Sequence, residues 1–360
     1  MAWIRLVIAL VACSALFSQD SRQVIVIAGR SPLLEIIDPV TLETLARIHF
    51  DFPNGSVGFN SAAMSADGSS VFIDGPIPSD TRGCCVLYSL DLATMKATVV
   101  ASIFGTRSRD QFVFSDGVVF PSASLSPNGP IKGIHDSMLH VSPNGQWAFG
   151  VRGYQGPVLE VFDMTRGKLV RELTPPQSEG EVRASGGWAG EHFYFIAGSK
   201  ENSGHLWMVS PDTIELGAGV PVDDYGEASS CAHPAFSELL AAGDKVFLYE
   251  PFGFKVDRRV RCHVPVPGGV WMIDPATGRQ AGRTAIGLHF STVVADRTGT
   301  FLYGLASEAL NQDGPGQLLR IDAKDGHVLK WRSIAPGFFR MTVAPISSVP
   351  TGDVFVVMDR

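Results

Sequence analysis

Residues 65–68 read Ser-Ala-Asp-Gly and lie between two short apolar runs. Asp-Gly and Asn-Gly pairs supply the positive φ that the two-residue turn of a β-hairpin needs. Related turns recur along the chain, and their glycines are Gly68, Gly117, Gly145, Gly190, Gly243, Gly299 and Gly352. Successive glycines are 49, 28, 45, 53, 56 and 53 residues apart, so all but one interval approximates a β-propeller blade. The repeat therefore predicts a radial array of small antiparallel sheets.

A second repeat, in the same period, is a strand that ends in Asp and is followed by a turn and another strand. Its clearest copies end at Asp38, Asp91, Asp163, Asp274 and Asp322. Asp side chains cap such turns by accepting hydrogen bonds from backbone N–H groups. Each blade is thus predicted to hold four strands. The predicted fold is an all-β, seven-bladed β-propeller, with six or eight blades as the open alternatives.

The two termini are predicted to close the last blade between them. Residues 339–343 and 354–358 resemble its inner strands, and residues 34–37 and 44–48 its outer ones. The apolar run at 24–28 is one strand too many for this arrangement. The segment between Gly117 and Gly145 is too short for a full blade, so it predicts either a truncated blade or a misassigned turn.

Residues 1–18 have the layout of a secretory signal, with Arg5 followed by an apolar run too short to span a bilayer. One interpretation is cleavage near Ser18. The other is that residues 10–13, Leu-Val-Ala-Cys, form a lipobox that would make Cys13 a lipid-bearing N-terminus. Either interpretation predicts a periplasmic or extracellular protein, with residues 19–360 as one propeller domain.

The composition agrees with a turn-dense β protein. The chain of 360 residues has 38 Gly and 23 Pro, and 45% hydrophobic residues are enough to fill a core. The net charge of −7 argues against general affinity for nucleic acid. No segment after Ser18 is apolar for long enough to form a transmembrane helix.

After removal of the signal, four cysteines remain, and an oxidising compartment would permit disulfides. The neighbours Cys84 and Cys85 are poor partners for each other because the ring would be strained. Cys231 and Cys262 fall in the same predicted blade, so a bridge between them is the favoured pairing. Buried, unpaired thiols are the alternative.

Polar residues recur where the first strands of several predicted blades begin, at the mouth of the channel. They are Asn60, His135, Asp136, His233, His289 and Arg340. Imidazoles and a carboxylate suit a transition metal, and Arg340 suits an anionic group, so a ligand site at this mouth is one interpretation. The other is that these side chains bond the neighbouring blade's backbone and serve the architecture alone.

A long loop on the same predicted face carries a basic patch in an acidic protein. Its cations are Lys255, Arg258, Arg259 and Arg261. The loop is interpreted either as a clamp for an acidic partner or as an ordinary solvated loop. The tryptophans in strand patterns are predicted to pack between blades, and they are Trp147, Trp188, Trp207, Trp271 and Trp331.

The last part of the chain resembles the extracytoplasmic propellers of the YVTN-repeat and quinoprotein amine dehydrogenase heavy-chain superfamily. The resemblance rests on Val-Trp-Met-Ile-Asp-Pro-Ala-Thr-Gly at 270–278, Gly-Leu-His-Phe-Ser at 287–291, Phe-Leu-Tyr-Gly at 301–304 and Leu-Arg-Ile-Asp at 319–322. In that enzyme family the quinone belongs to a separate small subunit. The resemblance therefore implies a partner protein, a periplasmic location and no cofactor on this chain.

Three functions are compatible with these observations. The chain carries no familiar catalytic motif that would favour an enzymatic function over a binding function. The favoured function is a secreted or periplasmic scaffold that binds a protein or ligand at its loop-rich face. The second is an amine dehydrogenase heavy-chain-like subunit beside a quinone-bearing small subunit. The third is a metal-dependent hydrolase of the lactonase type, which would place a metal at the mouth.

Overall fold

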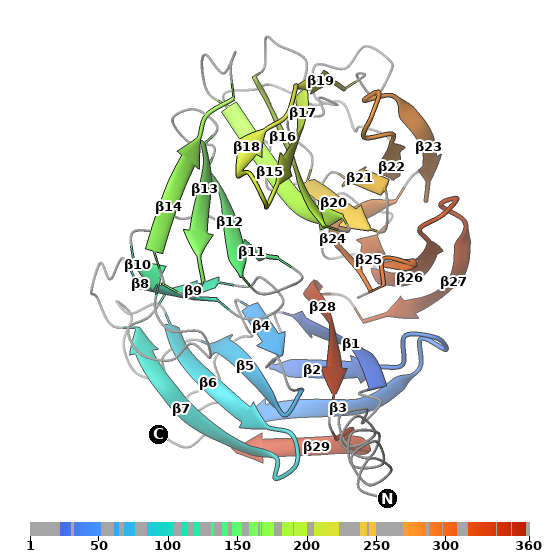
Figure 1. Cartoon of the computed structure of the whole chain (residues 1–360). Coiled ribbons are helices and arrows are strands. Elements are labelled where there is room, and N and C mark those ends of the chain that lie inside the picture. The colour runs from blue at the N-terminus through green and yellow to red at the C-terminus, as the bar shows by residue number, and fades with distance from the viewer. Residues whose placement is uncertain are drawn as a thin grey trace, which may run out of the picture.

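The structure is a computed structural model, and the residues that it describes are strands and the turns that join them (Figure 1). Within the described ranges there is no helix, and so none that could cross a membrane. The described residues are 22–29, 32–51, 61–64, 68–75, 85–103, 110–113, 119–121, 131–132, 139–142, 146–152, 158–164, 166, 168–175, 182–189, 191–199, 205–222, 238–242, 245–249, 269–285, 288–296, 298–307, 316–335, 337–346 and 348–357.

The strands collect into seven sheets, which Figure 1 shows arranged as a ring. Four sheets are regular and run in chain order from the centre outward: β4–β7, β11–β14, β20–β23 and β24–β27. All pairings within them are antiparallel, for example β24 with β25 and β25 with β26. Such a radial array of small antiparallel sheets is a β-propeller, as the turn repeat predicts.

The strands of these four sheets have the following bounds: β4 Ser61–Met64, β5 Ser70–Gly75, β6 Cys85–Asp91, β7 Lys96–Ile103, β11 Leu139–Val141, β12 Trp147–Arg152, β13 Val158–Asp163, β14 Lys168–Leu173, β20 Glu238–Ala242, β21 Lys245–Tyr249, β22 Val270–Ile273, β23 Gln280–Thr284, β24 His289–Ala295, β25 Phe301–Ser307, β26 Gly316–Asp322 and β27 Val328–Ile334.

Two further sheets depart from this plan. One contains β15 (Val182–Ala189), β16 (His192–Ser199), β17 (His205–Ser210), β18 (Glu215–Leu216) and β19 (Val220–Pro221), and both short strands pair with β17. The other holds β8 (Asp110–Val113), β9 (Val119–Pro121) and β10 (Ile131–Lys132) in the order β10-β8-β9. Two of its strands, β9 and β10, lie between Gly117 and Gly145, in the segment for which the sequence predicts a truncated blade or a misassigned turn, and β8 comes just before that segment.

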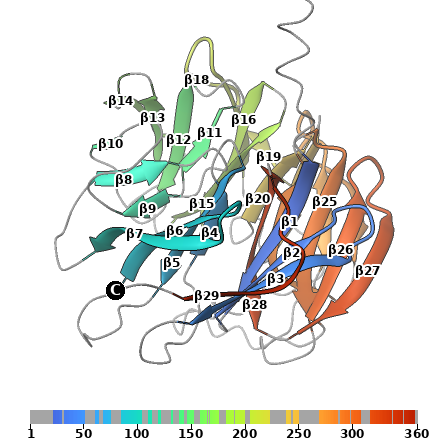
Figure 2. The ribbon, with the colours of Figure 1, turned by 90° about the horizontal axis from the view of Figure 1, so that it is seen from below.

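The remaining sheet joins the two ends of the chain, and we call it the closing sheet. Its order is β28 (Phe338–Ile346), β1 (Arg22–Gly29), β2 (Leu33–Ile37), β3 (Thr44–Asp51) and β29 (Gly352–Val357). Figure 2 shows it between the β24–β27 and β4–β7 sheets. Closure by strands from both termini is therefore confirmed.

The predicted strand order within the closing sheet is wrong. Residues 354–358 were expected to form an inner hairpin strand next to 339–343, but β28 pairs instead with β1, from Arg22↔Ile346 onward. The apolar run at 24–28, which has no place in the predicted arrangement, is thus part of the second strand of the closing sheet, counted from the centre. Consequently β29 lies at the outer edge, where it pairs with β3 in parallel. Pairing β1 with β28 is favoured because both strands bury apolar side chains, such as Ile25 and Ile27 at 0% exposure.

Asp turns join the third and fourth strands, as predicted. The carboxylate of Asp274 accepts a hydrogen bond from Ala276 N at 2.8 Å, and that of Asp91 accepts one from Thr94 N at 2.7 Å. These backbone hydrogen bonds lower the pKa of both carboxyl groups. The fourth residue after the capping residue has positive φ: Leu42 (57°), Met95 (55°), Ile214 (51°), Gly278 (70°) and Gly326 (77°).

The hydrophobic core lies between neighbouring sheets and not inside any one of them. Phe247 of the β20–β23 sheet and Phe290 of the β24–β27 sheet belong to one buried cluster. Another cluster joins Ile25 of the closing sheet to Leu305 of the β24–β27 sheet. A twisted sheet that packs both faces against neighbours buries nearly continuous apolar runs. This packing fixes each sheet against the next around the ring.

Candidate functional site

Two of the six residues predicted at the channel mouth fall on described strands. His289 is the first residue of β24, and Arg340 is the third residue of β28. These two inner strands belong to successive sheets and lie beside each other. In register, His289 pairs with Ser307 and Arg340 with Ala28. The backbone thus brings these two positions to neighbouring strands, while the convergence of the six side chains stays a prediction.

The other predicted site residues lie outside the described residues. They are Asn60, His135, Asp136 and His233 of the mouth, the basic loop Lys255, Arg258, Arg259 and Arg261, and the cysteines Cys231 and Cys262. The metal site, the basic clamp and the disulfide therefore stay predictions. Among the described residues, no group of three or more His, Cys, Asp or Glu side chains could hold a metal ion.

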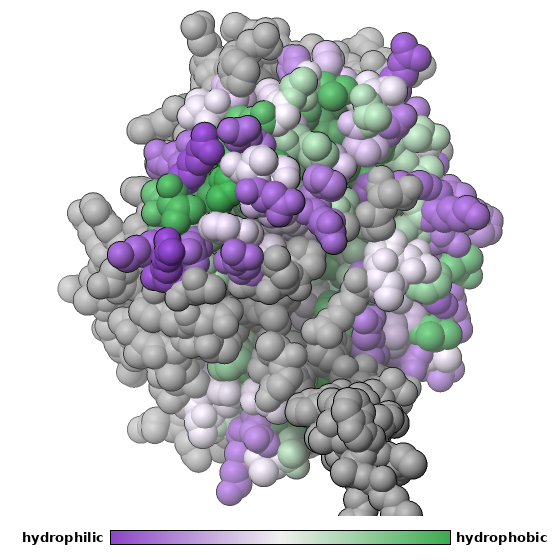
Figure 3. Space-filling model, in the orientation of Figure 1, coloured by the Kyte–Doolittle hydropathy of each residue, from purple (hydrophilic) through white to green (hydrophobic). Residues whose placement is uncertain are grey.

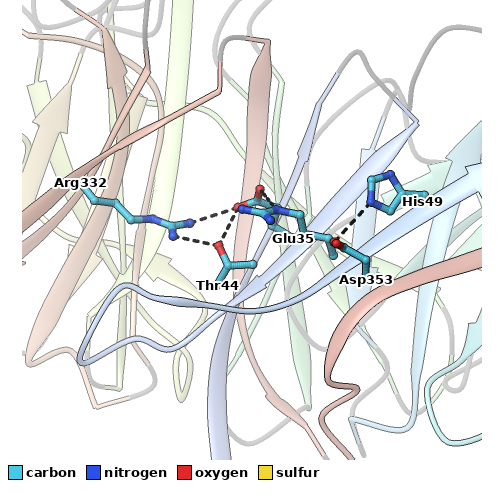
Figure 4. Close-up of polar contacts among 6 residues, drawn as sticks. Glu35, Thr44, His49, Arg332 and Asp353 are labelled. Atoms are coloured by element: carbon cyan, nitrogen blue, oxygen red, sulfur yellow. Dashed lines mark hydrogen bonds and ion pairs between the residues drawn. The ribbon is translucent and has the colours of Figure 1, made fainter.

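The described residues contain one polar network that the sequence analysis did not predict, centred on Glu35 of β2 (Figure 4). Glu35 Oε1 accepts a hydrogen bond from Arg47 Nε at 3.0 Å. Its Oε2 accepts one from Thr44 Oγ1 at 3.1 Å and another from Arg332 Nη2 at 3.1 Å. Arg332 Nη1 also donates to Thr44 Oγ1 at 2.9 Å. Both oxygens of this carboxylate are therefore occupied.

The network joins the β24–β27 sheet to the closing sheet, and we call the contact between these two sheets the seam. Arg332 lies on β27, whereas Glu35 and Thr44 lie on β2 and β3 of the closing sheet. The Glu35 side chain is only 8% exposed and that of Arg332 is 25% exposed. A buried carboxylate needs opposite charge and donors to offset its lost hydration, and two guanidinium groups with a hydroxyl provide both. The arrangement stabilises the contact between the closing sheet and the β24–β27 sheet.

A second contact continues the closing sheet toward its outer edge. His49 Nε2 of β3 lies 3.6 Å from Asp353 Oδ1 of β29 (Figure 4). The His49 ring also stacks on Phe355, with 4.7 Å between ring centroids. Phe355 is 76% exposed, so this stack holds an aromatic side chain at the surface. The two interactions pin the last described strand to the sheet.

The same seam holds a buried tyrosine. Tyr303 of β25 is 2% exposed, and burial raises the pKa of its phenol, while the neighbouring charge of Arg320 works in the opposite direction. The Arg320 guanidinium lies 3.9 Å from the centroid of the Phe301 ring. A cation over an aromatic face is favourable, and more so when it is partly desolvated. These groups also pack the β24–β27 sheet beside the closing sheet.

Chemically, the described polar groups at the seam are suited to holding sheets together. Both oxygens of Glu35 already accept hydrogen bonds, and its three partners come from two strands, β3 and β27. The signal that could have indicated the network is a single charged residue inside an apolar strand, Leu-Leu-Glu-Ile-Ile at 33–37. Such a residue needs a partner, although the sequence does not say that the partner is Arg332, 297 positions away.

The chain matches no protein-family model, and no curated protein sequence matches it. Among solved structures it is similar to dihydro-heme d1 dehydrogenase NirN, with 16% identity and a TM-score of 0.49, over 89% of this chain and 75% of that one. It is also similar to TolB from Acinetobacter baumannii (13% identity, TM-score 0.47, 91% and 67% of the two chains). For AztD from Citrobacter koseri the values are 13%, 0.43, 89% and 98%. At these identities the likeness concerns the fold alone.

Proposed function

We propose that this chain is an extracytoplasmic, seven-bladed β-propeller that acts as a binding scaffold. In this proposal each of the seven sheets is one blade, and the three-stranded β8–β10 sheet is the truncated one. A protein or a small ligand binds the loop-rich mouth of the central channel. Residues 1–18, which have the layout of a secretory signal, support export of the protein. If the signal is instead removed just before Cys13, that cysteine would carry a lipid anchor.

The observation that carries the proposal is the side-by-side position of β24 and β28, which begin near His289 and Arg340. A rigid ring that presents cationic and imidazole side chains at the ends of adjacent inner strands is a common way to hold an anionic ligand. Where the two sheets meet, Glu35 and Arg332 are paired with each other and support the ring. In this proposal, binding is therefore assigned to the beginnings of β24 and β28.

The test starts with the mature protein, purified from a host that exports it. Its N-terminus is sequenced, its metal content is measured, and proteins that copurify are identified. His289→Ala and Arg340→Ala are each compared with a control of the same residue type on an outer turn, His327→Ala and Arg279→Ala. The scaffold proposal expects the mouth variants to lose a ligand or a copurifying protein at unchanged melting temperature, while the controls keep it.

Other results would replace the proposal. One stoichiometric metal that disappears in His289→Ala would favour the hydrolase. A small partner with quinone absorbance would favour the heavy-chain-like subunit. Mouth variants that melt earlier and lose no ligand would mean that His289 and Arg340 serve only the architecture. An N-terminus that retains residues 1–18 would contradict export.

A further inference from the structure

Strand β27 forms the outer edge of the β24–β27 sheet. Within the described strands it pairs only with β26, so no described strand takes up the backbone groups of its other edge. Two of its large apolar side chains are exposed, Trp331 at 59% and Leu329 at 46%. Trp331 was predicted to pack between blades, and its exposure contradicts that prediction. Figure 3 shows hydrophobic atoms between hydrophilic ones on the side where β27 runs.

The register of β27 with β26 assigns its side chains to two faces. Trp331 pairs with Leu319, which belongs to the buried cluster shared with the β20–β23 sheet. Lys330 pairs with Arg320, and Arg332 reaches Glu35, so these two cations face the closing sheet. Successive strand residues point to opposite faces. The edge therefore has an apolar face at Trp331 and a cationic face at Lys330, beside Arg332, whose guanidinium is already bound to Glu35 and Thr44.

The closing sheet shows how the fold fills such an edge. There β29 adds to β3 as a parallel fifth strand, with Phe355 opposite His49 and Asp353 opposite Arg47. On the other face, Val356 packs into the cluster that contains the closing sheet's buried side chains. The added strand thus presents a carboxylate to the cationic face of β3 and valines to its apolar face. At β27 no described strand takes the corresponding place.

We propose that the outer edge of β27 binds an extended segment of a partner protein in which carboxylates alternate with apolar side chains. Backbone hydrogen bonds would supply affinity by strand addition, and the two faces of β27 would supply selectivity. The apolar side chains would cover Trp331, and the carboxylates would face Lys330. This proposal concerns the outer edge of the ring and does not depend on the mouth.

Charge favours this occupant over a second copy of the chain. Two β27 edges brought together would place Lys330 and Arg332 of one copy near the same cations of the other. The edge of β14 is a useful contrast, because its exposed Leu169 (37%) and Val170 (43%) are aliphatic. Its Arg171 is also engaged, since Nη1 donates to Ile214 O at 2.8 Å. This edge serves as the internal control.

The test measures binding of fluorescein-labelled peptides to the purified full chain by fluorescence anisotropy. The probe is Ser-Asp-Val-Asp-Val-Asp-Ser, and the matched probe has Lys in place of each Asp. Strand addition of so short a peptide is expected to be weak, with a dissociation constant of about 0.1–1 mM. Hydrogen exchange of the backbone amides of β27 and β14 is measured with and without the acidic probe.

The expected results are specific to β27. The lysine probe binds the unmodified chain at least about tenfold more weakly than the acidic probe does. The acidic probe binds Lys330→Glu at least about tenfold more weakly than it binds the unmodified chain. Trp331→Ala weakens binding about fivefold or more, because it removes the aromatic surface that the apolar residues cover. Val170→Ala, on β14, leaves binding unchanged. The amides of β27 gain protection from exchange and those of β14 do not.

Several results would overturn the proposal. These are no binding of the acidic probe up to about 1 mM, equal binding of both probes, or equal binding by the two β27 variants and Val170→Ala. A stable dimer of the unmodified chain that Trp331→Ala dissociates would show that a second copy covers the edge. Each variant's melting temperature is measured first, and Lys330→Gln replaces Lys330→Glu if the latter does not fold.

Discussion

The two Asp-turn glycines Gly278 and Gly326 allow a matched test of how closely the sheets pack. They occupy the same position of the turn, with φ of 70° and 77°. Replacing either by alanine places a Cβ in the left-handed region, at a cost of about 1 kcal/mol that both variants share. Their surroundings differ. The difference in their stability therefore reports on packing and not on backbone strain.

At Gly326 the nearest atom to the new Cβ would be Thr284 Cβ at 3.3 Å, so the neighbour has to give way by only a few tenths of an ångström. At Gly278 the new Cβ would overlap the carbonyl oxygen of Pro221 and come within 2.9 Å of its carbonyl carbon. Pro221 belongs to β19 in the neighbouring sheet, so relief requires one backbone to move away from another. Overpacking of this kind costs about 1–3 kcal/mol more. We expect losses of about 1 kcal/mol for Gly326→Ala and about 3 kcal/mol for Gly278→Ala.

Urea unfolding followed by tryptophan fluorescence checks both values. At a slope of about 3 kcal/mol/M, these losses shift the midpoint by about 0.3 M and about 1 M. The slopes should stay equal, because neither change alters the surface that unfolding exposes. Equal shifts for the two variants would refute the close approach between the turn at Gly278 and the neighbouring sheet. A larger shift for Gly326→Ala would refute the assignment of sheet neighbours as well.

Three further outcomes follow from the seam and the closing sheet. Burial raises the folded-state pKa of Tyr303, so stability should be complete below the ordinary value of 10.0 and fall as pH rises above it; Tyr303→Phe should reduce that fall in unfolding curves taken across alkaline pH. Glu35→Gln should cost about 2–3 kcal/mol and Arg332→Gln about 1–2 kcal/mol in urea unfolding, because the carboxylate serves two cations and Arg332 is partly exposed. A chain ending at Pro350 lacks β29 but should keep its circular dichroism spectrum, and its free energy of unfolding should fall by about 2–4 kcal/mol, mainly because Val356 is no longer buried. A chain ending at Gly337 also lacks β28 and should not fold. Equal behaviour of the two truncated chains would contradict the strand order.

The features that the sequence predicts correctly are local ones. A cap such as Asp274 bonds Ala276, two residues away, so the pattern itself contains both partners. Gly68 and Gly299 have φ of 70° and 67°, as their turns require. The Asp turn of the closing sheet gives Leu42 a φ of 57°, although the rules of turn composition do not place leucine at a positive φ. Leu42 is fully buried, and that burial offsets the strained backbone.

The features that the sequence does not predict depend on partners far apart in the chain. A hairpin of 339–343 with 354–358 is the natural expectation from the turn at Gly352, because strands joined by a tight turn usually pair. Pairing β28 with β1 instead links Ile25 to Val343 and completes the ring. Of the three partners of Glu35, Arg332 follows from that closure, since it comes beside β2 only when the ring is complete. The exposure of Trp331 likewise depends on which strand forms the outer edge of the sheet, and the sequence pattern of one strand does not show whether it is an edge strand.

Closure by both termini has a consequence for how the scaffold can vary. The innermost strand of the closing sheet comes from the C-terminal end and the next three from the N-terminal end, so the sheet forms only when the whole chain is in place. The tie between Glu35 and Arg332 then couples this sheet to its neighbour. Stability thus resides in contacts between sheets and at their Asp turns. A ring that is stabilised in this way is a scaffold on which loops can change without a change of fold.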